Sequence, residues 1–323
     1  MIEQLQGMLM KTGNDLGLTK ELLTNLFPRP ESVEEWLQYA LSEEQVRQFK
    51  QKGYVHRVPL LNEKQLESLR TQLQEMSQLD HVGREFFYEY HGNESENPDN
   101  VLFHALGAWR VCSAYHDILW NPAFLMVAYQ LLGTGFRLFH DQLFSKPAKH
   151  GSAVAWHQDY SYWTWTTPMT HLTCWMGLDD ADTENGCMYY VPGSHRWGLL
   201  EKKSLAGDMD AIRESLTPDQ VKKFDNKVPV AMKAGEASFH HPLLMHGSYE
   251  NRSERSRRAT LINVFSDGVV SNREDDGINA PGADNYPRVP KGQPMGGDYY
   301  PLLLDPDKAF WEIKDSIPTI ETL

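Results

Sequence analysis

Residues 136–145 read FRLFHDQLFS, and this stretch decides the fold class. Alternate residues of a β-strand share a face, so Phe136, Leu138, His140, Gln142 and Phe144 are expected on one side. Seven similar short runs follow, separated by turn residues, at 153–156, 171–178, 187–191, 228–232, 236–240, 243–247 and 259–266. Eight short antiparallel strands predict a jelly roll.

The sequence outside these runs predicts a single domain, residues 1–323, that is mainly β with flanking helices. Residues 1–132 are expected to form a mostly helical N-terminal support and residues 133–266 the jelly-roll core, with a polar insertion at 196–227. Residues 267–323 form an irregular C-terminal segment, rich in Gly, Pro, Asn and Asp over its first part. Long segments of this kind are often functional, so a lid is one possibility.

Helix signals support the N-terminal assignment. Ser42 and Gln45 have the spacing of a capping box, and Gly53 stands where that helix should stop. Asn62 and Gln65 repeat the capping-box spacing ahead of a stripe at helical intervals, formed by Leu66, Leu69, Leu73 and Met76.

Composition excludes several classes of partner. Asp and Glu number 44 against 31 Lys and Arg, a formal charge of −13, which disfavours nucleic acid and anionic membranes. No stretch is long and apolar enough to cross a membrane, and the N-terminus does not read as a signal peptide. Three cysteines do not make a disulfide framework. We therefore expect a cytoplasmic protein with a small-molecule substrate, whose oligomeric state the sequence does not indicate.

The clearest chemical motif is His157-Gln158-Asp159, with His246 89 residues later in another predicted strand. If residues 157 and 159 lie on one strand, their side chains point to the same side and could bind one metal ion. Two histidines and one carboxylate leave positions open on Fe(II), the arrangement of non-heme iron oxygenases.

Two residues near His246 are suited to bind a carboxylate. Arg257 begins the last predicted strand, and its planar guanidinium can meet a carboxylate with two hydrogen bonds. Ser248, two residues after His246, should face the same way. Arg258 competes with Arg257 for this role, because consecutive strand residues face opposite sides.

These motifs together resemble the phytanoyl-CoA dioxygenase family. The similar segments are His157-Gln158-Asp159, Trp175, Glu184-Asn185-Gly186-Cys187, Val191-Pro192-Gly193-Ser194-His195, His246-x-Ser248 and Arg257, with an opening at 41–55. The resemblance implies a double-stranded β-helix, a cupin-like jelly roll, that uses Fe(II), 2-oxoglutarate and O2 as cosubstrate.

The resemblance also implies roles for individual residues. His157, Asp159 and His246 match the iron ligands, and Arg257 and Ser248 match the 2-oxoglutarate carboxylate site. Trp175 and Gln142 match further positions beside that cofactor. The family's basic residue upstream of the barrel has no clear counterpart, with His104 as a possible substitute. Halogenases related to the family lack the carboxylate, so Asp159 favours hydroxylation.

Aromatic residues after the metal motif have two interpretations. Tyr160, Tyr162 and Trp163 are either a structural shell or a wall of the substrate pocket, which must be dry for oxidative chemistry. His240 and His241 are interpreted as structural or as supports of the ligands.

The sequence therefore predicts a dioxygenase that hydroxylates an unactivated C–H bond of a small organic substrate, releasing succinate and CO2. Two alternatives stay open within or near the family: an acyl-CoA hydroxylase of the phytanoyl-CoA type, and a non-catalytic cupin-like protein that binds a metal or ligand. A hydrolytic zinc enzyme is a third, and it would need no 2-oxoglutarate site. Fold and family do not fix the substrate.

Overall fold

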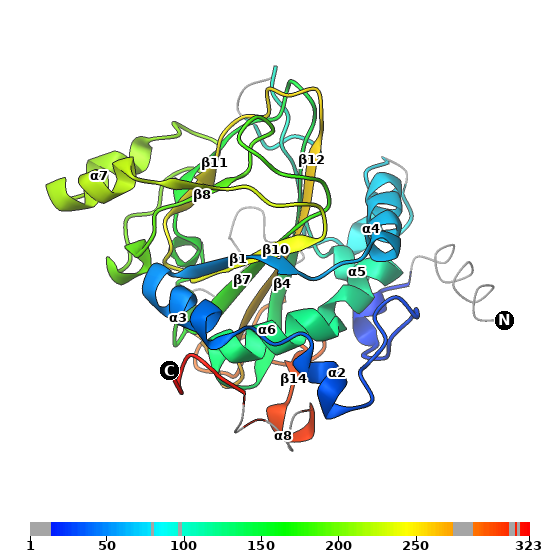
Figure 1. Ribbon diagram of the computed structural model, residues 1–323. Coiled ribbons are helices and arrows are strands. Elements are labelled where there is room, and N and C mark those ends of the chain that lie inside the picture. Colours follow the sequence, from blue (N-terminus) through cyan, green and yellow to red (C-terminus); the bar gives the residue numbers. More distant parts are fainter. Residues whose placement is uncertain (1–13, 79–80, 96–98, 274–286, 310–313, 315–316) are drawn as a thin grey trace.

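The computed structural model describes residues 14–78, 81–95, 99–273, 287–309, 314 and 317–323. The core consists of two antiparallel sheets that face each other (Figure 1). The large sheet has the order β1-β10-β7-β12-β4-β3-β2, with β14 also paired to β4, and the small sheet has the order β5-β11-β8-β9. A separate pair joins β13 to β6.

The strands of the large sheet are β1 (Tyr54–Pro59), β2 (Glu89–His91), β3 (Phe103–Leu106), β4 (Phe136–Lys146), β7 (His171–Gly177), β10 (Glu236–His240), β12 (Arg257–Ser266) and β14 (Leu302–Leu304). Those of the small sheet are β5 (Val154–His157), β8 (Met188–Tyr190), β9 (Val228–Val230) and β11 (His246–Ser248). The outlying pair is β6 (Thr166–Thr167) and β13 (Val270–Ser271). Each of the eight predicted runs contributes one strand to these two sheets, so the predicted jelly roll is confirmed.

Helices pack mainly on the outer face of the large sheet. The α-helices are α2 (Val33–Leu37), α3 (Glu43–Lys52), α4 (Glu63–Met76), α5 (Ser113–Asp117), α6 (Pro122–Leu132), α7 (Pro218–Asp225) and α8 (Pro306–Ala309). Short 3-10 helices are η1 (Leu16–Leu18), η2 (Arg84–Phe86), η3 (Ala108–Arg110), η4 (Ile118–Trp120), η5 (Asp159–Tyr162), η6 (Ser194–Arg196) and η7 (Ala211–Ser215). Figure 1 shows α3, α5 and α6 along the large sheet, with α7 beyond the small one.

The predicted helix signals are present. Ser42 and Gln45 form a capping box at the start of α3, which ends at Gly53 with φ 85°. Asn62 and Gln65 form a second box ahead of α4, whose apolar stripe is buried. The expectation that residues 1–132 are mostly helical needs qualification, because β1, β2 and β3 also come from them and extend the large sheet.

The alternation predicted for residues 136–145 is interrupted. Pairing with β12 steps from Asn263–His140 to Val264–Leu138, which leaves Phe139 as the extra residue of a β-bulge. Leu138 therefore packs in the core beneath the helices, whereas His140 and Gln142 line the interior of the barrel. The prediction that Leu138 shares a face with His140 and Gln142 was wrong, because the bulge reverses the faces.

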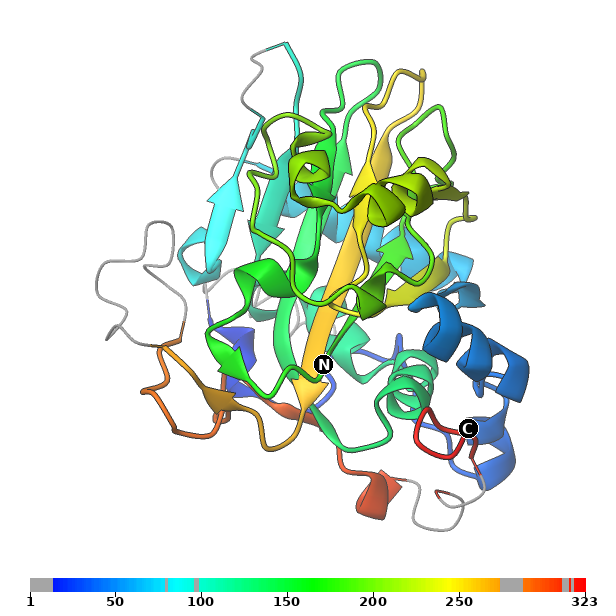
Figure 2. The same cartoon turned by 90° about the vertical axis from the view of Figure 1, so that its left-hand side faces the viewer.

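The insertion and the C-terminal segment both touch the barrel. In the insertion, η7 and α7 lie in front of the barrel in Figure 2, and Leu205 accepts a backbone hydrogen bond from Ala155 of β5. In the C-terminal segment, β13 pairs with β6 and β14 pairs with β4. Residues 274–286 of the possible lid lie outside the described residues, so the lid remains a prediction.

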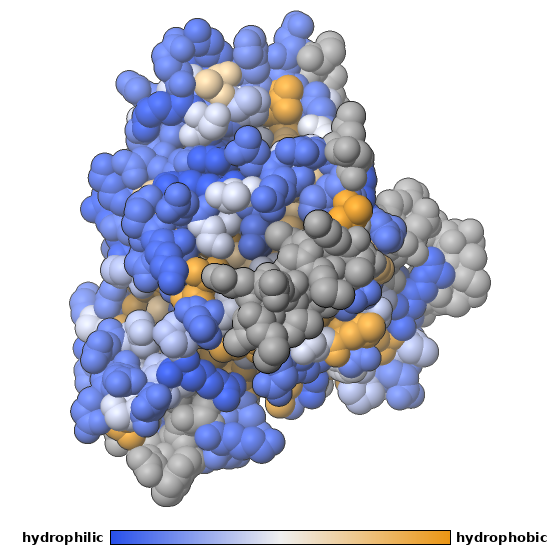
Figure 3. Space-filling view, turned by 90° about the vertical axis from the view of Figure 1, so that its right-hand side faces the viewer, coloured by the Kyte–Doolittle hydropathy of each residue, from blue (hydrophilic) through white to orange (hydrophobic). Residues whose placement is uncertain are grey.

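The described surface has few exposed apolar side chains. The face in Figure 3 is mostly hydrophilic, with hydrophobic residues in small groups. Among the described residues, no helix is both long enough and apolar enough to span a membrane.

Candidate metal centre

The two predicted histidine ligands meet across the small sheet. His157, the last residue of β5, and His246, the first of β11, are Cα partners, and their ring centroids are 4.1 Å apart. Each Nδ1–H donates a 2.8 Å hydrogen bond to the carbonyl two residues earlier, that of Ala155 or of Leu244. These bonds put the proton on Nδ1 and leave the Nε2 lone pair of both rings to bind a metal.

Asp159 completes the group, although it does not lie on a strand. The prediction that His157 and Asp159 share one strand was wrong, because β5 ends at His157 and Asp159 begins η5. Gln158 between them is still extended, with φ −115° and ψ 131°. Its amide donates to the carbonyls of Gly198 and Leu243, which anchors the motif while its neighbours face the cavity.

The carboxylate of Asp159 is oriented by its surroundings. Oδ2 accepts hydrogen bonds from Thr173 Oγ1 at 2.7 Å and His240 Nε2 at 3.0 Å. Oδ1 lies 3.5 Å from the Nε2 atom of His157 and 3.5 Å from that of His246. The protein thus fixes Oδ2 by hydrogen bonds, and Oδ1 lies beside the two imidazole Nε2 atoms, where it could bind the same metal ion.

Charge states in the group suit metal binding. Burial alone would raise the pKa of Asp159, but His246, His157 and His240 together hold it well below its ordinary value. Burial, and then the neighbouring His157, lower the pKa of His246 well below its ordinary value, so this imidazole is neutral. One ligand atom from each of His157, Asp159 and His246 lies within 4.8 Å of the others. Two imidazoles and one carboxylate fit Fe(II) with open coordination positions.

Arg257 is buried in the same cavity. Its Nη2 donates to the Gly186 carbonyl at 3.0 Å and to Ser248 Oγ at 3.3 Å, and its guanidinium lies 5.4 Å from the ring centroid of Trp175. Burial lowers its pKa to about 10, so it stays charged near neutrality. Arg258 faces away and forms a two-pronged ion pair with Asp179, as the alternation of a strand requires.

Lys146, which the sequence reasoning missed, lies beside Arg257. The two residues are Cα partners across β4 and β12. The fully buried Nζ of Lys146 donates to Ser248 Oγ at 2.6 Å and to the Tyr249 carbonyl at 2.7 Å. In the described part of the chain, no carboxylate forms an ion pair with Lys146 or Arg257. Burial and then the neighbouring Arg257 lower the pKa of Lys146 well below its ordinary value. The buried Arg257 without a described counter-ion, with Lys146 beside it, marks a site for an anion.

The other predicted site residues are placed as follows. Trp175 and Gln142 line the cavity, and Gln142 Oε1 accepts a 3.2 Å hydrogen bond from Asn263. Tyr162 and Trp163 also line it. Tyr160 is not among the lining residues, and its hydroxyl donates to the Thr166 carbonyl at 2.6 Å, so its placement supports the structural interpretation.

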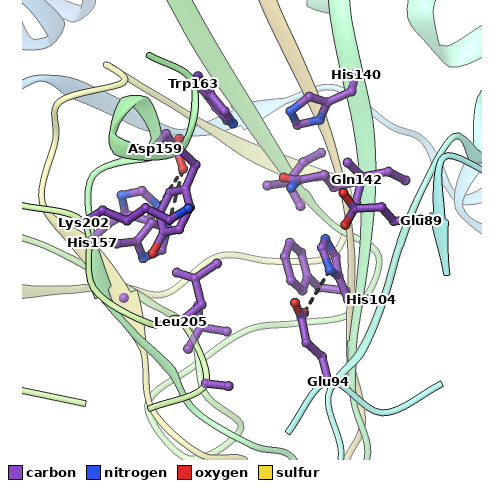
Figure 4. Close-up of a pocket in the computed structure, with 18 of the residues that line it drawn as sticks. Glu89, Glu94, His104, His140, Gln142, His157, Asp159, Trp163, Lys202 and Leu205 are labelled. Carbon is purple, nitrogen blue, oxygen red and sulfur yellow. Dashed lines mark ion pairs between the residues drawn. The ribbon is translucent and has the colours of Figure 1, made fainter. Parts of the chain in front are cut away.

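The cavity has a volume of about 1330 Å³ and opens between the two sheets (Figure 4). His157 and Asp159 lie on one side, and His140, Gln142, Glu89, His104 and Glu94 lie opposite. Residues 202–206 of the insertion and Asn272 and Arg273 complete the lining. The contributions of the insertion and of Glu89 and Glu94 carry no sequence motif, so the sequence did not indicate them. His104, the possible substitute for the family's basic residue, does line the cavity.

A jelly roll with two histidines and an aspartate on its inner surface defines a class of metal-binding barrel. The model of the family described as Phytanoyl-CoA dioxygenase (PhyH) matches residues 49–259, more than half of the chain. The chain therefore belongs to the phytanoyl-CoA dioxygenase family, which confirms the resemblance seen in the sequence.

Individual relatives agree with this assignment. A phytanoyl-CoA dioxygenase of Arabidopsis thaliana is 33% identical over 159 residues, 48% of this chain and 53% of the relative. An L-proline trans-4-hydroxylase of Streptomyces griseoviridis is 28% identical over 193 residues, 53% of this chain and 72% of the relative. The chain thus spans about half the length of the phytanoyl-CoA dioxygenase relative.

Solved structures share the fold. The non-heme alpha ketoglutarate dependent carbocyclase SnoK from nogalamycin biosynthesis has a TM-score of 0.66 and 24% identity, covering 82% of this chain and 97% of its own. At this identity the likeness shows the fold alone, and it confirms the jelly roll.

Proposed function

We propose that this protein is an Fe(II)- and 2-oxoglutarate-dependent dioxygenase that hydroxylates an unactivated C–H bond of a small organic substrate, releasing succinate and CO2. One observation carries the proposal. Three metal-ligand side chains and the buried Arg257, which has no described acidic partner, line the same cavity, and the buried Lys146 donates to Ser248 of that lining. A metal ion alone would not require basic side chains at this position. A dicarboxylate bound to the metal would require them, because its far carboxylate needs a basic partner.

The metal would be held by Nε2 of His157, Nε2 of His246 and Oδ1 of Asp159. When bound, Fe(II) with 2-oxoglutarate and O2 would supply the oxidising chemistry. The protein fixes the donors before metal arrives, because Ala155, Leu244, Thr173 and His240 each hold one of the ligand side chains in place. Such supports preserve the geometry through the reaction.

The anion site would hold the far carboxylate of 2-oxoglutarate. Ser248 Oγ accepts hydrogen bonds from both Lys146 and Arg257, so its own proton is free to be donated toward a carboxylate in the cavity. Arg257 would add a charge-assisted hydrogen bond. Trp175 lies against the guanidinium and limits where it can point.

Aromatic side chains would exclude water around the reacting carbon. Trp163 and Tyr162 line the cavity beside the metal ligands, and the Tyr162 ring packs edge-on against His157 with centroids 5.9 Å apart. The family name alone does not assign a CoA thioester as substrate. A relative named for hydroxylation of L-proline supports a small free substrate.

The cellular setting is part of the same proposal. The three cysteines are free and buried, which suits a reducing compartment such as the cytoplasm. The charge of −13 argues against nucleic acid and anionic membranes as partners.

A screen of candidate substrates for stimulated succinate release, with Fe(II), 2-oxoglutarate and O2 supplied, tests the proposal. Stimulated release is expected from the wild-type protein and not from His246→Ala. His241→Ala is the matched control, because His241 lies outside the cavity lining. Equal activity in His246→Ala and the wild type would contradict the proposed metal site.

A further inference from the structure

The wall of the cavity opposite the metal ligands carries two carboxylates. Glu89 begins β2, and Glu94 follows the same strand, while His104 comes from β3, paired with β2. All three side chains line the cavity and lie across it from His157 and Asp159 in Figure 4. We refer to Glu89, Glu94 and His104 as the acidic wall.

His104 supplies an unsatisfied polar atom in this wall. The residue is 5% exposed, and its ring stacks on Phe144 with centroids 4.5 Å apart. Nδ1 lies 2.9 Å from Glu94 Oε2, close enough for an ion pair. Neither Nδ1 nor Nε2 has a hydrogen-bond partner of good geometry in the part of the chain that the structure describes, and Nε2 has no ion-pair partner there either. In the tautomer that carries its proton on Nδ1, Nε2 is an acceptor that a donor on a ligand would satisfy.

Glu89 lacks a strong cationic partner. Among the described residues its one ion pair is with His91, whose Nε2 lies 3.7 Å from Glu89 Oε2. Burial raises the pKa of Glu89, although His104 and His91 act in the opposite direction. A cation bound at the wall would offset this cost of burial.

Basic side chains in the cavity are engaged elsewhere. Lys203 pairs with Glu201 at 2.9 Å, and Lys202 lies over the Tyr162 ring at 4.6 Å. Arg273 lies over the Trp165 ring at 4.3 Å. Lys202 stands beside His157 in Figure 4, on the side opposite Glu89 and Glu94. Lys202 and the acidic wall therefore lie on opposite sides of the cavity.

We propose that the acidic wall binds a protonated amine of the substrate, so that the substrate class is a small molecule with a primary or secondary ammonium group. This inference rests on the proposed function and specifies its substrate. An ammonium offers several N–H donors, which Glu89, Glu94 and Nε2 of His104 can accept. A neutral polyol would lack the charge attraction, and an acyl-CoA would bring phosphates toward carboxylates.

Matched compounds and variants test this proposal in the fully loaded protein. Anaerobic calorimetry with Fe(II) and 2-oxoglutarate bound would compare L-lysine, L-arginine, L-ornithine and L-proline, each with its fully N-acetylated counterpart. At least one free amine should bind about 10-fold or more tightly than its acetylated form, the scale of one charge-assisted hydrogen bond. Glu89→Gln and Glu94→Gln should each remove that preference.

Glu85→Gln is the matched control, because Glu85 is exposed and outside the cavity lining. Loss of the amine preference with unchanged 2-oxoglutarate affinity would support the acidic wall. The proposal is overturned if no free amine binds, or if binding is the same in Glu89→Gln, Glu94→Gln and the wild type. A loaded protein that does not bind 2-oxoglutarate would instead contradict the proposed function, so the two failures are distinguishable.

Discussion

Lys146 and Arg257 face each other across β4 and β12, and both donate hydrogen bonds to the hydroxyl of Ser248. Both side chains are buried, and no described carboxylate pairs with either. Burial and Arg257 lower the pKa of Lys146 well below its ordinary value, and an anion bound beside the pair would oppose this effect. The arrangement explains how one end of a dicarboxylate would be held at a fixed position relative to the metal ligands.

Replacement of Arg257 should affect the cofactor far more than the metal. Arg257→Ala should cost about 2–5 kcal/mol of 2-oxoglutarate binding, because a charge-assisted hydrogen bond to a buried carboxylate is lost. Calorimetric titration of the iron-loaded variant measures this. Arg258→Ala is the control and should leave the affinity unchanged, because Arg258 pairs with Asp179 outside the cavity. A larger loss in Arg258→Ala would reverse the assignment.

Lys146→Met should weaken 2-oxoglutarate binding by about 10-fold while changing the free energy of unfolding little. The hydrogen bonds of Nζ are lost, but so is the cost of burying an amine whose pKa burial and Arg257 lower well below its ordinary value. Cofactor titration and thermal unfolding of the same sample measure both effects. In a Ser248→Ala background the effect on binding should shrink, since Lys146 acts through that hydroxyl. An undiminished effect there would show that Lys146 acts independently of Ser248.

The sequence predicted the fold, and it singled out the three residues that meet in the candidate metal centre. Strand alternation, capping boxes and the His-x-Asp spacing are local, so residues 136–145, Ser42 and His157 could be interpreted from their neighbours. The β-bulge at Phe139 depends on pairing with β12, which no local pattern records. Contributions from Lys146 and from the acidic wall also depend on strands pairing over long sequence separations.

Asp159→Gly should abolish hydroxylated product while part of the metal and cofactor binding survives. His157, His246 and Arg257 remain in this variant, but one anionic ligand is gone. The measurements are metal content, and product formation with the substrate found in the screen. Product formation at the wild-type rate would remove Asp159 from the metal site.

Thr173→Val should weaken metal affinity although Thr173 does not touch the metal. The substitution keeps the shape of the side chain but removes the 2.7 Å hydrogen bond to Asp159 Oδ2. Loss of such a supporting bond typically costs about 10–100-fold in metal affinity or activity. Competition with a chelator gives the affinity, and Thr167→Val, at an exposed position, is the control. Equal affinities in the two variants would mean that Asp159 does not need this support.

The central claim is that one cavity binds Fe(II) and 2-oxoglutarate together, and anaerobic calorimetry tests it most directly. Fe(II) is titrated first and 2-oxoglutarate second, into the wild type and into His157→Ala, His246→Ala and Arg257→Ala. We predict one Fe(II) and one 2-oxoglutarate per wild-type chain, weakened iron binding in both histidine variants, and weakened cofactor binding alone in Arg257→Ala. Iron-loaded wild-type protein that binds no 2-oxoglutarate, or histidine variants with unchanged iron affinity, would contradict the account.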